Sequence, residues 1–315
     1  MEGTLLRPNN LSWGLLQVRK EGELGESVMD VNRFGLKRRP FPPTPDTSFY
    51  YPSSLHEAAL ATLQRAIDDN DSFVLLTGMP GTGKTLVGYT LLEKLGDQVA
   101  SAFITNCHLP DRASLLQAIL YDLGLPYEDD HEQMLRLRVT EYLLKQCAAS
   151  KRTIIVIDEA HHLKADLLEE LRLLANLESG AGKAVQFVLL AQPPILRTLT
   201  QPGLESLQQR IAIRATIGPL ALEEASDYLL HHLRLAGGKP EKIFEDAALE
   251  TIARGTHGIP RCLNQAAHQA MSLADAGELS KVDEEAAIEA LAMLGYQTDE
   301  SSENEPAIQK FQRSA

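Results

Sequence analysis

The sequence predicts an α/β fold, in which helices cover both sides of a parallel sheet, followed by a smaller all-helical domain. Strand and helix patterns alternate through residues 54–217, which is typical of a parallel sheet with helical crossovers. From residue 222 the strand patterns stop and only helix patterns follow. The 315 residues are 44% hydrophobic and 23% charged, as in a globular protein with one or two domains.

The individual elements follow from short apolar runs and from apolar residues at helical spacing. Each predicted strand is a run of β-favouring residues: 73–77, 99–105, 153–157, 184–191 and 211–217. The predicted helices of the first part repeat apolar residues every three or four positions: 54–69, 86–92, 111–123, 132–149 and 163–177. The second part repeats the same pattern four times: 222–236, 246–254, 260–276 and 283–294.

The residues before the first helix divide into two segments. Residues 1–32 have no strong periodicity, and we expect a poorly ordered extension in which Met29 is an alternative start to Met1. Residues 34–52 contain five prolines, which exclude a regular helix. Their aromatic side chains favour burial: Phe34, Phe41, Phe49, Tyr50 and Tyr51. We therefore expect an extended strap laid over the domain that follows.

The formal net charge of −13 argues against a protein whose main task is to coat nucleic acid, because such proteins carry a basic balance or stripe. The three cysteines lie far apart without CxxC spacing, so we expect neither a disulfide framework nor a zinc site. No apolar run approaches the ~18 residues of a membrane span, and no signal peptide is recognisable. These features predict a cytoplasmic protein without membrane insertion. The acidic residues 296–315 are expected to be a disordered tail.

Residues 78–85 match the phosphate-binding loop of nucleoside triphosphatases, G-x-x-x-x-G-K-T, between a predicted strand and a predicted helix. Its glycines allow the backbone N–H groups to turn toward an anion, and the helix that follows directs its positive end at the phosphates. Lys84 is expected to reach the β- and γ-phosphates, and the Thr85 hydroxyl to ligate Mg²⁺. The predicted nucleotide-binding residues are Gly78, Met79, Pro80, Gly81, Thr82, Gly83, Lys84, Thr85 and Leu86.

A second chemical element follows the apolar strand 153–157, which ends in two carboxylates. Asp158 is expected to hold Mg²⁺ beside the loop, and Glu159 to act as the general base on the attacking water. The pair is interpreted as Walker B. His161 and His162 are interpreted as helix-start residues facing different directions, not as metal ligands.

With a helical C-terminal domain, these motifs resemble the AAA+ ATPases. More specifically, four stretches resemble the general secretion pathway protein A-type family and related transposon target-selection ATPases. They are PFPPTPDTSFYYPSSLHEAAL (40–60), LLAQPPILRTL (189–199), LQQRI (207–211) and HGIPRCLNQAA (257–267). The resemblance covers about residues 33–294 and implies a P-loop NTPase fold of three α/β/α layers with a small helical lid.

The resemblance also implies further site residues. Gln192 matches sensor 1, which contacts the γ-phosphate or the attacking water, and Arg261 matches sensor 2 on the lid. Arg210 matches the arginine finger that a neighbouring subunit inserts. The other candidates are Arg197 and Arg214 for the finger, and Asn106 for a contact with the catalytic water or Glu159.

The expected organisation is an extension (1–32), an ATPase domain with its strap (33–219), a lid (220–295) and an acidic tail (296–315). The expected function is Mg²⁺-dependent ATP hydrolysis by a homo-oligomer, ring or filament, that acts on a protein partner. Catalysis is expected from Lys84, Glu159, Gln192 and Arg210, and nucleotide binding also from Asp158 and Arg261. The alternative is an ATP-dependent DNA-binding regulator of the transposition type, for which Lys37-Arg38-Arg39 is the one compact basic cluster. Partner, pathway and assembly form stay open.

Overall fold

The computed structural model describes residues 32–128, 131–179, 182–211 and 213–296. The expected extension and acidic tail lie almost wholly outside these ranges. At the centre is a five-stranded parallel sheet in the order β2-β3-β6-β1-β7. Its strands are β1 Phe73–Gly78, β2 Val99–Ile104, β3 Arg152–Ile157, β6 Gln186–Ala191 and β7 Ile213–Ile217. The predicted parallel α/β architecture is confirmed.

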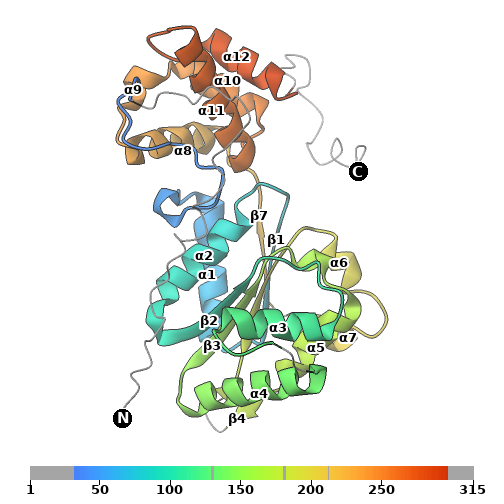
Figure 1. Cartoon of the computed structure of the whole chain (residues 1–315). Helices are drawn as coiled ribbons and strands as arrows, with labels where there is room; N and C mark the ends of the chain where they lie inside the picture. The colour runs from blue at the N-terminus through green and yellow to red at the C-terminus, as the bar shows by residue number, and fades with distance from the viewer. Residues whose placement is uncertain (1–31, 129–130, 180–181, 212, 297–315) are drawn as a thin grey trace, which may run out of the picture.

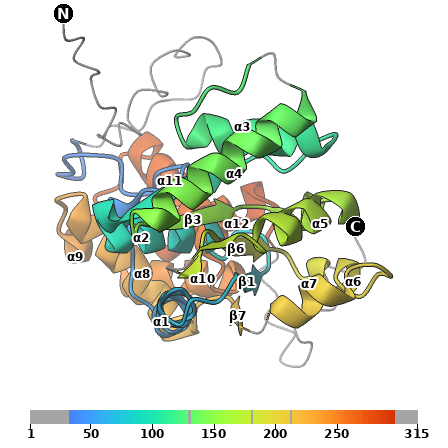
Figure 2. The same ribbon diagram turned by 90° about the horizontal axis from the view of Figure 1, so that it is seen from below.

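Helices cover both faces of this sheet, which is why its strands are continuous apolar runs (Figures 1 and 2). On one face, α1 Ser54–Asp68 and α2 Lys84–Leu95 pack over Val74 and Leu76 of β1. The alternate residues, Phe73 and Leu75, point to the other face. That face is covered by α3 Arg112–Asp122, α4 Glu132–Ala148, α5 Ala165–Leu174, α6 Ile195–Thr198 and α7 Glu205–Arg210.

Short elements that the sequence did not predict fill the connections. They are the hairpin of β4 Glu178–Ser179 and β5 Gly182–Lys183, the short helices α6, α7 and α9 Pro240–Ile243, and the 3₁₀ turns η1 Thr47–Phe49, η2 Gly96–Gln98 and η3 Ala160–His162. The helix expected over 163–177 is shorter because η3 precedes it and α5 begins only at Ala165. The strands expected from 184 and 211 begin two residues later in each case, at Gln186 and Ile213.

After β7 the chain is helical, as predicted. The elements are α8 Leu222–Leu235, α9 Pro240–Ile243, α10 Asp246–Gly255, α11 Pro260–Ala276 and α12 Glu284–Met293. Their apolar residues form one buried cluster apart from the two clusters on the sheet faces. No helix in the described ranges is both long enough and apolar enough to cross a bilayer.

The strap was expected over the domain that follows it, and this expectation was right only in part: Tyr50 packs on the sheet cluster covered by α1 and α2, but the fully buried strap residues do not. Its buried side chains, including Phe41 and Phe49, belong to the cluster of the C-terminal helices. Both rings stack on His232 of α8, with ring centroids 5.8 and 5.0 Å away. The sheet faces are already covered by their own helices, whereas α8 leaves an apolar side that the strap's aromatic rings bury.

Candidate functional site

The predicted phosphate-binding loop joins the end of β1 to the start of α2, as its sequence setting required. Gly81 and Gly83 have φ angles of 79° and 94°, in the left-handed region that favours glycine. A Cβ atom at Gly78 would lie 2.7 Å from the carbonyl oxygen of Ile217. The glycines are therefore required by the backbone path of the loop.

Lys84 is buried inside this loop. Its Nζ donates hydrogen bonds to the carbonyls of Gly78 and Met79, at 3.0 and 3.1 Å. Burial lowers the pKa of Lys84, although the nearby carboxylates of Glu159 and Asp158 act in the opposite direction. Among the described residues no carboxylate forms an ion pair with Nζ, so a phosphate anion would supply the counter-charge that this buried ammonium lacks.

Thr85 and Asp158 meet across the loop. The Thr85 hydroxyl donates to Asp158 Oδ2 at 2.6 Å, and Asp158 Oδ1 accepts the backbone N–H of Glu159 at 2.9 Å. Burial raises the pKa of Asp158, while the hydrogen bonds from Thr85 and Glu159 oppose the shift. A hydroxyl and a carboxylate are hard oxygen ligands, so this pair fits Mg²⁺ beside the loop.

Glu159 follows in an unusual backbone conformation, with φ 51° and ψ 35°. Left-handed backbone at a residue other than glycine is strained, and such strain is concentrated at functional sites. Its Oε2 accepts a hydrogen bond of 3.1 Å from Nε2 of Gln192, the residue that follows β6. The structure thus brings together Lys84, Asp158, Glu159 and Gln192, which the sequence had placed in one site.

The two histidines after Glu159 do not diverge as expected. The rings of His161 and His162 lie 4.1 Å apart, and the ring of His108 lies 4.1 Å from His162. The expectation assumed α-helical geometry, but these residues form the 3₁₀ turn η3. Asn106 is exposed, and its Oδ1 accepts the backbone N–H of His108, so its described contact is not with Glu159.

Arg261 lies against the phosphate-binding loop. Its backbone N–H donates to the carbonyl of Gly81 at 3.2 Å, and its positive charge contributes to lowering the pKa of Lys84. A Cβ atom at Gly81 would lie 3.0 Å from Cβ of Arg261. The first turn of α11 is therefore packed on the loop, with the exposed Arg261 side chain beside it.

In the described ranges, the three candidates for the arginine finger do not contact the site formed by Lys84, Asp158, Glu159 and Gln192. Arg210 ends α7, at the side of the sheet away from α2 (Figures 1 and 2). Its Nη1 is buried and has no hydrogen-bond partner within the described part of the chain. Arg197 and Arg214 are exposed.

The sequence missed His56 of α1, which supports the loop from below. Its Nε2 lies 2.7 Å from the carbonyl oxygen of Thr82, and its Nδ1 lies 2.6 Å from Oγ of Ser53. A carbonyl only accepts, so Nε2 carries the proton and Nδ1 accepts from the Ser53 hydroxyl. Nothing in the local sequence distinguishes His56 from an ordinary buried helix residue.

A small cavity of about 30 Å³ lies beside this histidine, where three parts of the chain meet. Strap, loop and C-terminal helices all contribute to its lining: Tyr50, Tyr51, His56, Gly83, Leu86, Leu220, Tyr228 and Pro260. Leu86 thus faces this cavity. The sequence pattern predicted that Tyr50 and Tyr51 of the strap would be buried, but it did not predict that they lie beside the loop.

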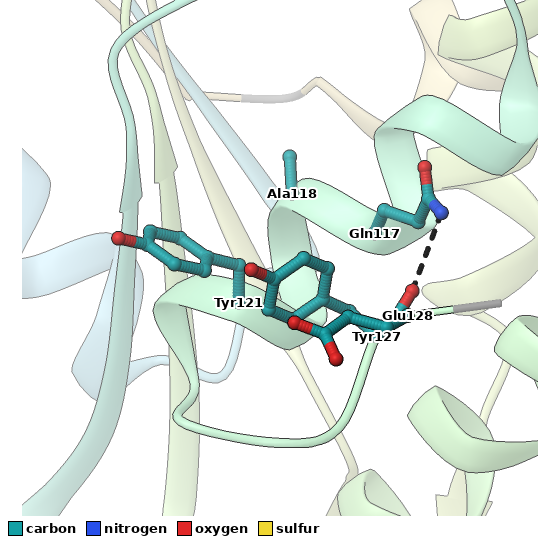
Figure 3. Close-up of a pocket in the computed structure, with 5 residues that line it drawn as sticks. All are labelled: Gln117, Ala118, Tyr121, Tyr127 and Glu128. Atoms are coloured by element: carbon teal, nitrogen blue, oxygen red, sulfur yellow. Dashed lines mark hydrogen bonds between the residues drawn. The ribbon is translucent and has the colours of Figure 1, made fainter.

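A larger open hollow, of about 430 Å³, lies elsewhere, at the end of α3 (Figure 3). It is lined by Gln117, Ala118, Tyr121, Tyr127 and Glu128, and contains none of the predicted site residues. Tyr121 and Tyr127 form an edge-to-face pair there, with centroids 5.2 Å apart.

Comparison with known proteins finds a family and several relatives. A family described as AAA domain matches residues 67–199. General secretion pathway protein A of Aeromonas hydrophila is 40% identical over 250 residues, or 79% of this chain and 45% of that protein. The Holliday junction branch migration complex subunit RuvB of Chlorobaculum parvum is 28% identical over 224 residues, or 68% of this chain and 55% of that protein. The chain thus spans about half the length of these relatives.

Solved structures show the same fold. The Aeropyrum pernix ORC2 protein aligns with a TM-score of 0.64 at 18% identity, over 81% of this chain and 71% of that one. The Thermotoga maritima RuvB branch migration motor aligns with a TM-score of 0.51 at 17% identity, over 82% of this chain and 74% of that one. The resemblance to AAA+ ATPases of the general secretion pathway protein A type, and the predicted fold, are confirmed.

Proposed function

Because the chain contains an AAA domain similar to that of general secretion pathway protein A, we propose that it hydrolyses ATP with Mg²⁺ at the loop of residues 78–85. The observation that carries this proposal is the convergence of five side chains from the start of α2 and the ends of β3 and β6. Thr85 Oγ1 lies 2.6 Å from Asp158 Oδ2, and Gln192 Nε2 lies 3.1 Å from Glu159 Oε2. Lys84 lies buried in the same loop.

Each group has a role in this proposal. The backbone N–H groups of the loop and Lys84 hold the phosphates, and Thr85 with Asp158 would hold Mg²⁺, which neutralises charge on the β- and γ-oxygens when bound. Glu159 accepts a proton from the attacking water, and Gln192 orients that carboxylate or the water. Arg261 reaches the nucleotide from the lid.

We further propose that the active form is a homo-oligomer. Arg210 matches the arginine-finger position of the family and ends α7, on the face of the sheet opposite α2, which supports a role toward a neighbour's γ-phosphate and not toward its own loop. In this proposal residues 33–219 form the ATPase domain and residues 220–295 form the lid. ATP hydrolysis drives a change in a protein partner. Three cysteines without disulfides favour a cytoplasmic site of action.

The test is Glu159→Gln, with Glu141→Gln on the exposed side of α4 as the control. We expect Glu159→Gln to bind ATP like the unaltered protein and to lose phosphate release by a factor of roughly 10² to 10⁴. Glu141→Gln should keep both ATP binding and phosphate release. Full phosphate release by Glu159→Gln would overturn the assignment of the base.

A second candidate is an ATP-dependent DNA-binding regulator. Its support is the likeness to RuvB, which by name acts on Holliday junctions, and the basic cluster Lys37-Arg38-Arg39 in the strap. DNA binding that needs ATP and weakens steeply with salt would favour it. If the protein did not bind DNA at low salt in the presence of ATP, this second function would be excluded. The acidic balance of the chain makes it the weaker candidate.

A further inference from the structure

The ring of His161 connects the end of β6 to the carboxylate of Glu159. Its Nδ1 faces the backbone N–H of Gln192 at 3.3 Å, and its Nε2 lies 3.4 Å from Glu159 Oε2. A neutral imidazole carries one N–H. Because Nδ1 accepts the backbone N–H of Gln192, the proton belongs on Nε2, the ring nitrogen that lies nearer the Glu159 carboxylate. The Gln192 contact thus selects one tautomer.

The same tautomer argues against a metal at this position. Ligand atoms of Glu159, His161 and His162 lie within 4.8 Å of one another, which by spacing alone fits a metal. A metal-ligating histidine donates its other ring N–H to an acceptor. Here the other nitrogen of His161 faces the N–H of Gln192, so a metal on Nε2 would require that hydrogen bond to be broken.

Glu159 needs such support. Its backbone is strained at φ 51°, and its side chain is 37% exposed, so its own packing does not fix the carboxylate. Gln192 Nε2 donates to Oε2 of this side chain, and His161 Nε2 lies 3.4 Å from the same oxygen. In the described structure Oε1 therefore stays open to accept a proton from water.

We propose that His161 is a positioning residue that holds the Glu159 carboxylate through Nε2–H and fixes it to the end of β6. This inference rests on the proposed role of Glu159 as the general base. Burial, followed by the neighbouring His162, lowers the pKa of His161, which keeps the ring neutral at pH 7 and preserves its single donor.

Three substitutions separate the two contacts. In His161→Gln the amide Nε2 takes the place of the ring Nε2 and keeps a donor toward Glu159. In His161→Asn the amide oxygen takes the place of Nδ1 and keeps only an acceptor toward Gln192 N–H. His161→Ala loses both, and His162→Gln is the matched control on the same turn.

Phosphate release and the dissociation constant of a fluorescent ATP analogue are measured on the full chain. We expect His161→Ala and His161→Asn to lower kcat by roughly 10- to 100-fold with unchanged ATP affinity, because a small misplacement of a reacting group has this effect. His161→Gln should recover most of the loss, and His162→Gln should match the unaltered protein. Unchanged kcat in His161→Ala, or equal rescue by Asn and Gln, would overturn the proposal.

A readout independent of turnover is the ¹⁵N NMR signal of the His161 ring. We expect a protonated Nε2 and a bare Nδ1, and the opposite tautomer would contradict the inference. If the unaltered protein released no phosphate, the proposed function would fail, while the NMR signal would still decide the contacts of His161.

Discussion

The backbone N–H of Arg261 donates a hydrogen bond of 3.2 Å to the carbonyl of Gly81, which ties the first turn of α11 to the phosphate-binding loop. The contact is possible because Gly81 has no Cβ: one built there would lie 3.0 Å from Cβ of Arg261 and 3.1 Å from Cγ2 of Ile259. The C-terminal helices therefore approach the loop through its backbone.

Gly81→Ala tests this approach, with Gly203→Ala as a matched control. Both glycines have left-handed φ angles, 79° and 94°, but a Cβ at Gly203 meets nothing within 4 Å. Each change should carry a backbone cost of about 1–2 kcal/mol, and only Gly81→Ala should also displace Arg261. We expect ATP affinity to fall roughly tenfold for Gly81→Ala, and not for Gly203→Ala. Equal affinities in the two variants would show that the contact is dispensable.

The Thr85–Asp158 pair predicts how Mg²⁺ affects ATP binding. Thr85→Val removes the hydroxyl that lies 2.6 Å from the Asp158 carboxylate, whereas Thr85→Ser keeps it. We expect Mg²⁺ removal by a chelator to weaken ATP binding in the unaltered protein and in Thr85→Ser. Thr85→Val should bind ATP equally with and without Mg²⁺, as followed by titration with a fluorescent analogue. A normal Mg²⁺ effect in Thr85→Val would exclude the hydroxyl as a ligand.

His56 is predicted to stabilise the loop from α1. His56→Leu leaves the Thr82 carbonyl without the donor that now lies 2.7 Å away, and an unpaired buried group costs about 1–3 kcal/mol. His56→Gln, whose amide can reach the same carbonyl, should recover part of this stability. Thermal unfolding measures both, with the exposed His131→Leu as control. Equal unfolding temperatures for His56→Leu and the control would contradict the prediction.

The pair of Arg136 and Glu170 joins α4 to α5 through two hydrogen bonds of 2.7 Å, and the Glu170 side chain is fully buried. Arg136→Met should destabilise the fold by about 3–5 kcal/mol, because it leaves a buried carboxylate unpaired. Adding Glu170→Met should recover much of that loss. The Arg172–Glu169 pair, whose carboxylate is 31% exposed, is the control, and Arg172→Met should cost less than about 1 kcal/mol. Denaturant unfolding measures the stability of the three variants and of the unaltered protein, and no recovery in the double variant would contradict the prediction.

His232 predicts a pH dependence of stability. Burial lowers its pKa from 6.5 to about 4, and its Nδ1 donates to the Pro40 carbonyl at 2.9 Å. The unfolded state binds the proton more readily than the folded state does. The contribution of His232 to the free energy of unfolding is therefore fully present above about pH 6.5 and is lost as the pH falls toward 4. The loss is on the order of 3 kcal/mol. In His232→Asn, which keeps a donor but does not titrate, the slope of unfolding free energy against pH should be shallower over this interval. An identical slope would exclude His232 as its source.

The elements that the sequence predicted well are those whose signal is local. Strand β1, the loop after it and helix α2 follow from an apolar run, a glycine pattern and a helical repeat within about twenty residues. Asp158 and Glu159 could be placed beside the loop because parallel strands end at one edge of a sheet. The arginine finger and the domain boundaries stay predictions.

Contacts between distant segments depend on tertiary packing. His56 supports the loop, the strap's Phe41 and Phe49 cover α8, and His161 accepts the backbone N–H of Gln192. None of these has a local pattern, because each depends on which apolar surface was left uncovered or which carbonyl was left without a donor. The sequence by itself therefore determined the nucleotide-binding motifs and the order of strands and helices. The tertiary structure decided which side chains hold those motifs in place, because that support comes from residues far away in the chain.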